Sequence, residues 1–192
     1  MDTTRPSLLI RVKRPDDGSA WNEFYRLYAP LLARFGRSRG LSADDAEDVA
    51  QECMNVLARK MRDFDYSRDR GSFKNYLFTQ VCNQITDRLR RKRPRLAESG
   101  ELKRAQAKED PEAVRQWERQ WLQEHLAYCL EKLEREFSPN TIAAFKLYVL
   151  EEWPVEKVCD SLGINANQVY LSKSRVTRRL RAELSQLVGD VL

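Results

Sequence analysis

Histidine is nearly absent from this sequence, with His125 as the single copy in 192 residues. No set of cysteines or carboxylates accompanies it at the spacing of a metal site. The chain also lacks a glycine-rich phosphate loop, a nucleophile elbow and a paired-carboxylate motif. Because an active site needs a set of positioned reactive groups, we expect a protein that is not an enzyme, with no catalytic residue, no metal site and no cofactor. We expect His125 to pack between helices.

Cysteine is scarce as well, and its four copies lie far apart without forming a C-x-x-C pair. They are Cys53, Cys82, Cys129 and Cys159. This spacing indicates reduced, buried thiols rather than disulfides or a zinc site. Long hydrophobic runs are also missing: residues 1–14 contain none, and no stretch suits a secretory signal or a membrane-spanning helix. We therefore expect a cytoplasmic protein without membrane insertion.

Glycine and proline number only seven each. An all-β sandwich or barrel usually needs more turn residues, so their scarcity favours an all-α fold. Apolar residues make up 42% of the chain and charged residues 33%. That composition supplies compact helical cores beneath a heavily charged surface.

Positive charge is concentrated in two clusters, although the formal net charge is only +5. The first cluster comprises Arg88, Arg90, Arg91, Lys92, Arg93 and Arg95, and the second comprises Lys173, Arg175, Arg178, Arg179 and Arg181. Residues 42–69, in contrast, are acidic overall. Clustered lysine and arginine are typical of a phosphate-binding surface. The alternative interpretation is a pair of solvated helix faces.

Apolar residues recur at helical spacing through the N-terminal half of the chain. The first predicted helix spans 20–35, with Ser19 as its N-cap and Pro30 kinking or breaking it. Ser42 begins the second helix, which ends near residue 62. Ser72 begins the third helix, which runs into the first basic cluster.

The sequence predicts two small helical domains joined by a flexible linker. Residues 96–112 form the predicted linker, because this stretch has few large apolar residues and mixed charges. The predicted domains are therefore 1–95 and 113–192. A long amphipathic helix begins at Pro111, and a further helix begins after the N-cap Ser138.

Residues 155–181 predict a helix-turn-helix. A short helix that ends at Gly163 is followed by a turn containing Ile164 and by a second helix from Ala166 past Leu180. The outward side of that second helix is polar and basic, which suits the major groove of DNA. An ordinary helical hairpin with a charged face is the alternative. The candidate base-contacting residues are Asn167, Gln168, Tyr170, Ser174 and Arg175, with Lys173, Arg178, Arg179 and Arg181 on phosphates.

The third predicted helix combines aromatic and polar side chains with the first basic cluster. Aromatic rings beside a basic track are typical of single-strand binding, because bases can stack on them. Phe73 and Tyr76 lie near its start, followed by Asn83, Thr86 and Asp87. Core packing is the alternative for both rings.

Two long segments resemble a known family. DAEDVAQECMNVLARKMRDFD and GSFKNYLFTQVCNQITDRLRRKR resemble region 2 of the sigma-70 family, and SPNTIAAFKLYVLEEWPVEKVCDSLGINANQVYLSKSRVTRRLRAEL resembles its region 4. The two matches come in the expected order with a linker between them. The chain leaves no room for the extra domains of housekeeping members, which points to the extracytoplasmic-function (ECF) subfamily.

The resemblance implies a sigma factor, a non-catalytic subunit that directs RNA polymerase to promoters. In region 2 of the family, the second helix binds the clamp coiled coil of the polymerase. The residues of this sequence that match that helix surface are Asp48, Gln51, Met54 and Ala58. The stretch 67–91 would recognise the −10 element as a separated strand, through Tyr76, Asn83, Asp87, Arg88 and Arg91. Thr79 and Gln80 stand where housekeeping members place melting aromatics, so strand opening would use fewer stacking platforms.

The region 4 match implies recognition of the −35 element by the helix from Ala166, and contact with the polymerase flap. The implied partners are core RNA polymerase and promoter DNA. An anti-sigma protein holds many family members inactive, and the sequence neither requires nor excludes one here. A stand-alone helix-turn-helix regulator, with a sensor or dimerisation domain in its N-terminal half, is the competing interpretation. A helical adaptor would leave both basic clusters unexplained.

Overall fold

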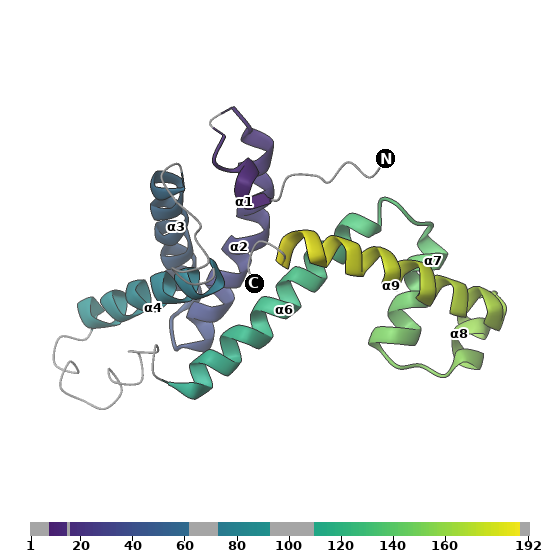
Figure 1. The fold of residues 1–192 in the computed structure, drawn as a ribbon. Helices are drawn as coiled ribbons and strands as arrows, with labels where there is room; N and C mark the ends of the chain where they lie inside the picture. Colours follow the sequence, from purple (N-terminus) through teal and green to yellow (C-terminus); the bar gives the residue numbers. More distant parts are fainter. Residues whose placement is uncertain (1–7, 15, 62–72, 93–109, 189–192) are drawn as a thin grey trace. The chain divides into compact units, whose positions relative to one another are not determined.

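A computed structural model describes residues 8–14, 16–61, 73–92 and 110–188 of the chain, and these residues form helices and connecting turns without a β-strand (Figure 1). The predicted all-α class is therefore confirmed. The chain divides into two compact units, one of residues 1–124 with 190–192 and one of residues 125–189. The helices are α1 (Leu8–Arg11), α2 (Gly18–Ser38), α3 (Ala43–Lys60), α4 (Phe73–Lys92), α6 (Pro111–Leu133), α7 (Pro139–Phe145), η3 (Lys146–Leu150), α8 (Val155–Leu162) and α9 (Ala166–Val188).

In the N-terminal unit, α2 begins earlier than the sequence predicts. Asp17, and not Ser19, is the N-cap, because the Asp17 carboxylate accepts a hydrogen bond from the Ala20 N–H at 2.9 Å. Hydrogen bonds from Ser19 and Arg11 lower the pKa of Asp17 to about 2. The helix also continues through Pro30 without a break.

The turn from α2 into α3 follows the local sequence. Gly40 has a φ of 91°, a left-handed conformation that glycine adopts without steric cost. Ser42 is the N-cap of α3, as predicted, and its Oγ accepts a hydrogen bond from the Asp45 N–H at 3.3 Å. The predicted N-cap of α4, Ser72, lies outside the described residues.

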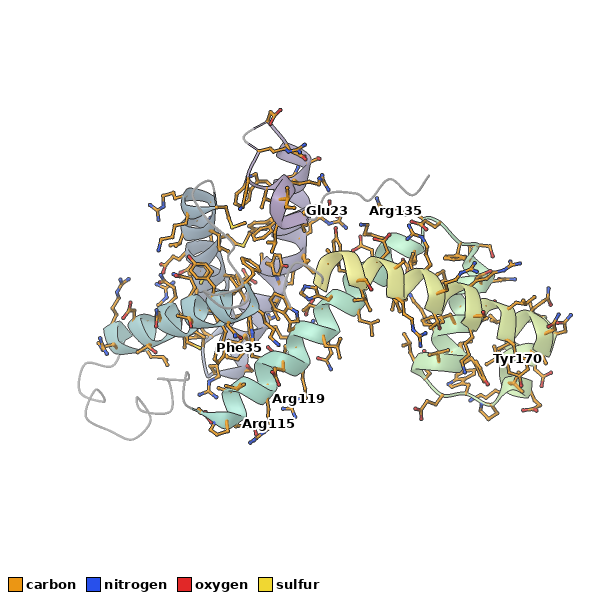
Figure 2. The ribbon with its side chains drawn as sticks, viewed as in Figure 1. Glu23, Phe35, Arg115, Arg119, Arg135 and Tyr170 are labelled. Atoms are coloured by element: carbon orange, nitrogen blue, oxygen red, sulfur yellow. The ribbon has the colours of Figure 1, made fainter. Side chains whose placement is uncertain are left out.

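An aromatic cluster forms the core of the N-terminal unit and includes the first part of α6. The ring of Trp117 lies 5.2 Å from that of Phe35 on α2 and 5.6 Å from that of Phe78 on α4, measured between centroids. One turn later, the Trp121 ring lies 5.5 Å from that of Tyr28. Figure 2 labels Phe35 among these side chains. Residues 110–124 thus complete the core of this unit.

Ion pairs at the edges of the aromatic cluster hold the same segment. Asp110 pairs with Arg39 at 3.2 Å, and Glu124 pairs with Arg34 at 2.8 Å. The compact units consequently divide at Glu124, further along the chain than the predicted linker at 96–112. Most of that predicted linker lies outside the described residues.

The C-terminal unit begins its helical hairpin as the sequence predicts. Ser138 is the N-cap of α7, and Pro139 occupies the first turn. The helix then widens into the π-helical η3, which the sequence analysis did not predict. Glu152 follows with a φ of 55°, a left-handed conformation that is uncommon for a residue with a side chain.

Helices α8 and α9 form the predicted helix-turn-helix. Gly163 ends α8 with a φ of 64°, and its N–H donates to the carbonyl of Cys159. Ala144, Val158 and Val169 form the buried centre, and Ile164 in the turn packs against it. Helices α7 and α8 of the same compact unit therefore fix the orientation of α9.

The cysteines carry no disulfide, and three of the four are buried. Burial raises the pKa of the Cys53 thiol, and separately that of Cys129, to about 12. Cys159 is half-buried. Among the described residues, no group of side chains is placed to hold a metal ion, and none of the helices is long and apolar enough to cross a membrane.

We expect Cys159 to react first with a thiol reagent in the native protein. The thiolate is the reactive species, and a pKa near 12 leaves Cys53 and Cys129 almost wholly protonated at neutral pH. Peptide mass spectrometry after timed labelling would give the rate at each site, with urea-unfolded protein as the control. Equal native rates at Cys53 and Cys159 would contradict the described burial.

Candidate nucleic-acid interface

The outer side of α9 presents most of the residues that the sequence analysis assigned to it. The seven predicted residues are exposed, and they are Asn167, Gln168, Tyr170, Lys173, Ser174, Arg175 and Arg178. Val169, Val176 and Leu180 lie on the opposite side and are buried. The helix thus packs through an apolar face and leaves a polar, basic face toward solvent.

Gln168 also has a role in starting the helix. Its Oε1 accepts a hydrogen bond from the Asn165 N–H at 2.9 Å, and the Gln168 N–H donates to Asn165 Oδ1 at 2.9 Å. This reciprocal pair is a capping box formed by Asn and Gln. The side-chain oxygen of Gln168 is therefore engaged within the helix, and its amide nitrogen is the atom that would reach a base.

A basic groove of about 450 Å³ follows the exposed face of α9. It is lined by Tyr170, Lys173, Ser174, Thr177, Arg178 and Arg181. The Tyr170 ring, labelled in Figure 2, meets the Tyr148 ring edge-on at 5.8 Å between centroids. Lys173 Nζ lies 5.4 Å from the centre of the Tyr148 ring. The groove therefore combines cations with an aromatic wall, which suits a nucleic-acid backbone.

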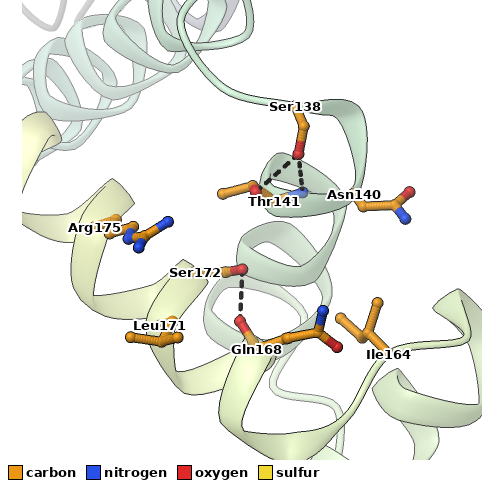
Figure 3. Close-up of a pocket in the computed structure, with 8 residues that line it drawn as sticks. All are labelled: Ser138, Asn140, Thr141, Ile164, Gln168, Leu171, Ser172 and Arg175. Atoms are coloured by element: carbon orange, nitrogen blue, oxygen red, sulfur yellow. Dashed lines mark hydrogen bonds between the residues drawn. The ribbon is translucent and has the colours of Figure 1, made fainter.

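A second groove, of about 310 Å³, lies on the other flank of α9 (Figure 3). Gln168, Leu171, Ser172 and Arg175 line it from α9, while Ile164 comes from the turn and Ser138, Asn140 and Thr141 come from the start of α7. Sequence reasoning missed Asn140 and Thr141 because only the tertiary fold places them beside α9. It also missed Thr177, which helical spacing from Lys173 and Ser174 would have indicated.

Arg179 does not belong to the exposed face, although the sequence analysis placed it on phosphate. Its guanidinium donates to both carboxylate oxygens of Glu136, at 2.8 and 3.0 Å, and to Glu183 Oε1 at 2.8 Å. The hydrogen bonds to Glu136 and the charges of both carboxylates raise the pKa of Arg179. Arg179 therefore holds the unit together.

Helix α4 displays most of the residues predicted for the −10 contacts. Asn83, Asp87 and Arg91 are exposed and recur at helical spacing on one side. Tyr76 lies half-buried at the start of this row, and burial raises the pKa of its hydroxyl. Arg93 and Arg95, like residues 67–72, lie outside the described part of the chain.

Arg88 points instead toward α3. Its Nε lies 3.4 Å from Asp45 Oδ1, and its Nη2 pairs with Asp48 Oδ2. The structure thus joins two residues that the sequence analysis assigned to different partners, Arg88 to DNA and Asp48 to the polymerase. In this arrangement Arg88 is an internal ion-pair partner.

Three of the four residues that were predicted to contact the polymerase are exposed on α3. Asp48, Gln51 and Ala58 are exposed. Met54 is only 4% exposed and belongs to the core, so its side chain lies away from any partner of that face. Met54 was a candidate only through the family resemblance, and the structure places its side chain in the buried stripe of α3.

Part of the chain matches a known protein family. Residues 24–95 match the family model of sigma-70 region 2. No match was found among curated protein sequences. Among solved structures, the chain is similar to a chain of the structure of CnrH in complex with the cytosolic domain of CnrY. That pair shares 18% sequence identity over 93% of this chain and 95% of the other, with a TM-score of 0.36.

The family match covers most of α2 and the whole of α3 and α4. These are the helices that carry the acidic face and the row of polar residues described above. By sequence, residues 24–95 therefore match a sigma-70 region 2 domain.

Proposed function

We propose that this protein is a cytoplasmic sigma factor of the ECF type. It binds core RNA polymerase, recognises −10 and −35 promoter elements and directs promoter-specific initiation without catalytic activity of its own. The observation that carries this proposal is the presence, in one chain, of a sigma-70 region 2 domain and a helix-turn-helix with an exposed basic face.

In this proposal, each of three exposed surfaces binds one partner. The acidic face of α3, with Asp48, Gln51 and Ala58, meets a basic surface of the polymerase, where opposite charges favour docking. The exposed row on α4 contacts the separated −10 strand. The outer side of α9 enters the major groove at the −35 element. An anti-sigma partner is an expectation of the family resemblance alone.

Run-off transcription with bacterial core RNA polymerase and a library of genomic promoter fragments tests the proposal. We expect transcripts with defined starts only when the protein is added. Arg175→Ala should reduce them by roughly 5- to 150-fold, because a good side-chain contact to a base is worth about 1–3 kcal/mol. Asn83→Ala should reduce them through the −10 element.

Arg135→Ala is the matched control, because it removes an exposed arginine of the same unit that lies outside both grooves of α9 (Figure 2). It should leave the transcripts unchanged. Absence of defined starts with every fragment would reject the sigma-factor assignment.

A stand-alone helix-turn-helix regulator is the second candidate, and it is favoured by the compactness of residues 125–189 as a unit. DNA footprinting separates the two. A symmetric footprint without polymerase would support the regulator, whereas a directional footprint that requires core polymerase would support the sigma factor.

A further inference from the structure

Leu171 is an aliphatic side chain on the polar, basic face of α9. It is 43% exposed, whereas Val176 of the same helix is fully buried. At 3.6 residues per turn, Leu171 lies roughly 140° around the helix axis from Val176, so it belongs to the outward side. Its neighbours there, one turn away along the helix, are the exposed Asn167, Ser174 and Arg175. The fold therefore leaves a large apolar side chain in the middle of the face that would meet DNA.

The place of Leu171 distinguishes it from an ordinary exposed leucine. Scattered exposed leucines are common on protein surfaces and indicate nothing by themselves. Leu171, however, lines the groove of about 310 Å³ together with Arg175 (Figure 3). The residue before it, Tyr170, and Ser174 line the basic groove on the other flank of α9. Leu171 thus lies between the two grooves, where base edges rather than phosphates would face the helix.

The chemistry of a leucine side chain limits what it can recognise in DNA. It neither donates nor accepts a hydrogen bond, so phosphate oxygens and polar base edges would lose water against it without gaining a partner. In the major groove, the C5-methyl group of thymine is the apolar group that a base presents. The exposed surface of Leu171 therefore favours thymine over the other bases.

We propose that Leu171 is a specificity-determining residue that packs against the C5-methyl group of a thymine in the duplex site of α9. This inference deepens the proposed function and rests on it only through duplex recognition by this helix. Arg175 is four residues further along, about 6 Å at the rise of an α-helix. Because neighbouring base pairs are about 3.4 Å apart, the thymine should lie about one or two base pairs from the base that Arg175 contacts.

The test begins with a duplex site that the full-length protein selects from a random library, alone and with added core polymerase. Each thymine of the site is then replaced in turn by deoxyuridine, which lacks only the C5-methyl group, and the affinity is measured by fluorescence anisotropy. We expect a substitution near the Arg175 contact to weaken binding by about fourfold, the effect of one buried methyl-sized group. Unchanged affinity at every thymine would overturn the proposal, as would failure to select a duplex under either condition.

Leu171→Ser identifies the side chain that is responsible. At the sensitive position this variant should bind the thymine and deoxyuridine duplexes equally, because no apolar contact is left to lose. The comparison is made within one variant, so an effect of the methyl group on DNA shape would remain visible as a difference. A fourfold difference that persists in Leu171→Ser would therefore overturn the proposal.

Leu150→Ser is the matched control, because Leu150 is a 45% exposed leucine of the same unit that lies outside both grooves. It should keep the fourfold difference, and its loss here would mean that the difference does not depend on Leu171. Leu171→Met keeps an apolar side chain at the reading position and should also prefer thymine. This second variant decides the matter if Leu171→Ser does not fold, since equal binding of both duplexes by folded Leu171→Met would contradict the proposal.

Modified cytosine gives an independent measurement at the same position. Replacing the sensitive thymine by cytosine, with guanine opposite, removes the methyl group and changes the polar edge of the base pair. Using 5-methylcytosine instead restores the methyl group alone. The unmodified protein should bind the 5-methylcytosine duplex about fourfold more tightly than the cytosine duplex, and Leu171→Ser should bind the two equally. Equal affinities for the unmodified protein would count against the proposal.

These measurements involve no promoter and no transcription. A negative run-off result together with a methyl preference that depends on Leu171 would reject the sigma-factor assignment and leave this proposal standing. A normal run-off result without any methyl preference would do the reverse.

Discussion

Trp117→Ala is expected to lower the free energy of unfolding of the N-terminal unit by about 3–5 kcal/mol, the usual cost of removing a large buried aromatic side chain. Trp117 is 2% exposed, and its ring packs against Phe35 and Phe78 from two other helices. Truncation would therefore open a cavity where α2, α4 and α6 meet. The remaining side chains can collapse into it only partly, since Trp121 is itself fixed against Tyr28.

Hydrogen exchange of the full chain in increasing urea measures this effect, because peptides from α2 and α4 report the N-terminal unit alone. Trp117→Phe keeps an aromatic ring in this position. It also removes an indole Nε1 that has no hydrogen-bond partner among the described residues. This variant should therefore lower the free energy of unfolding by less than about 1.5 kcal/mol. Leu122→Ala, at a 61% exposed position of the same helix, should be nearly neutral. A small effect of Trp117→Ala would show that α6 is not part of this core.

Arg179→Ala is expected to lower the free energy of unfolding of the C-terminal unit by about 2–3 kcal/mol. The substitution leaves the Glu183 carboxylate, which is 4% exposed, with Lys132 as its cation at 3.1 Å. Breaking a fully buried ion pair costs about 3–5 kcal/mol. The expected loss is smaller here because Lys132 stays and Arg179 itself is about one-third exposed.

Arg178→Ala provides the matched comparison at the adjacent position. Arg178 is exposed in the basic groove, so its removal should leave stability within about 0.5 kcal/mol. It should instead reduce the salt slope of duplex DNA binding by about 1. Urea-dependent hydrogen exchange of α7 and α9 peptides, together with DNA titrations, separates the two roles. Similar stability for the two variants would contradict the inward orientation of Arg179.

The local features of this fold were predictable from the sequence because their causes are local. Ser42 and Ser138 are N-caps, and Gly163 ends α8 in the left-handed conformation, as predicted. The outward face of α9 followed from the helical period once the buried residues of the same helix were recognised. A cap, a turn or an amphipathic face is set by residues within a few positions of one another.

The ion pairs of Arg88 with α3 and of Arg179 with Glu136 could not be predicted, because these partners are distant in sequence. Arg88 and Arg179 each belong to a run of arginines that looks uniformly exposed. Arg88 is nevertheless bound by two carboxylates of α3, and Arg179 is bound by Glu136 from the turn after α6 and by Glu183 one turn further along α9. Charge clustering indicates a basic surface but does not show which member of the cluster turns inward. Similarly, the sequence did not show that the side chain of Met54 on α3 is buried rather than exposed.

The packing partners of the α6 aromatic residues and the π-helical form of η3 also could not be predicted from the sequence. Periodicity marks Trp117 and Trp121 as buried, but it does not show that they pack on helices from the other side of the predicted linker. The widening at residues 146–150 has no recognised sequence signal.

The membership of residues 110–124 in the N-terminal core matters for the exchange of domains between related genes. A crossover within residues 96–109 would pair the α6 aromatics of one parent with the α2 and α4 surfaces of another. A crossover after Glu124 keeps each set of contacting rings from a single parent. Hybrids that exchange the helix-turn-helix should therefore inherit both tryptophans together with helices α2 to α4.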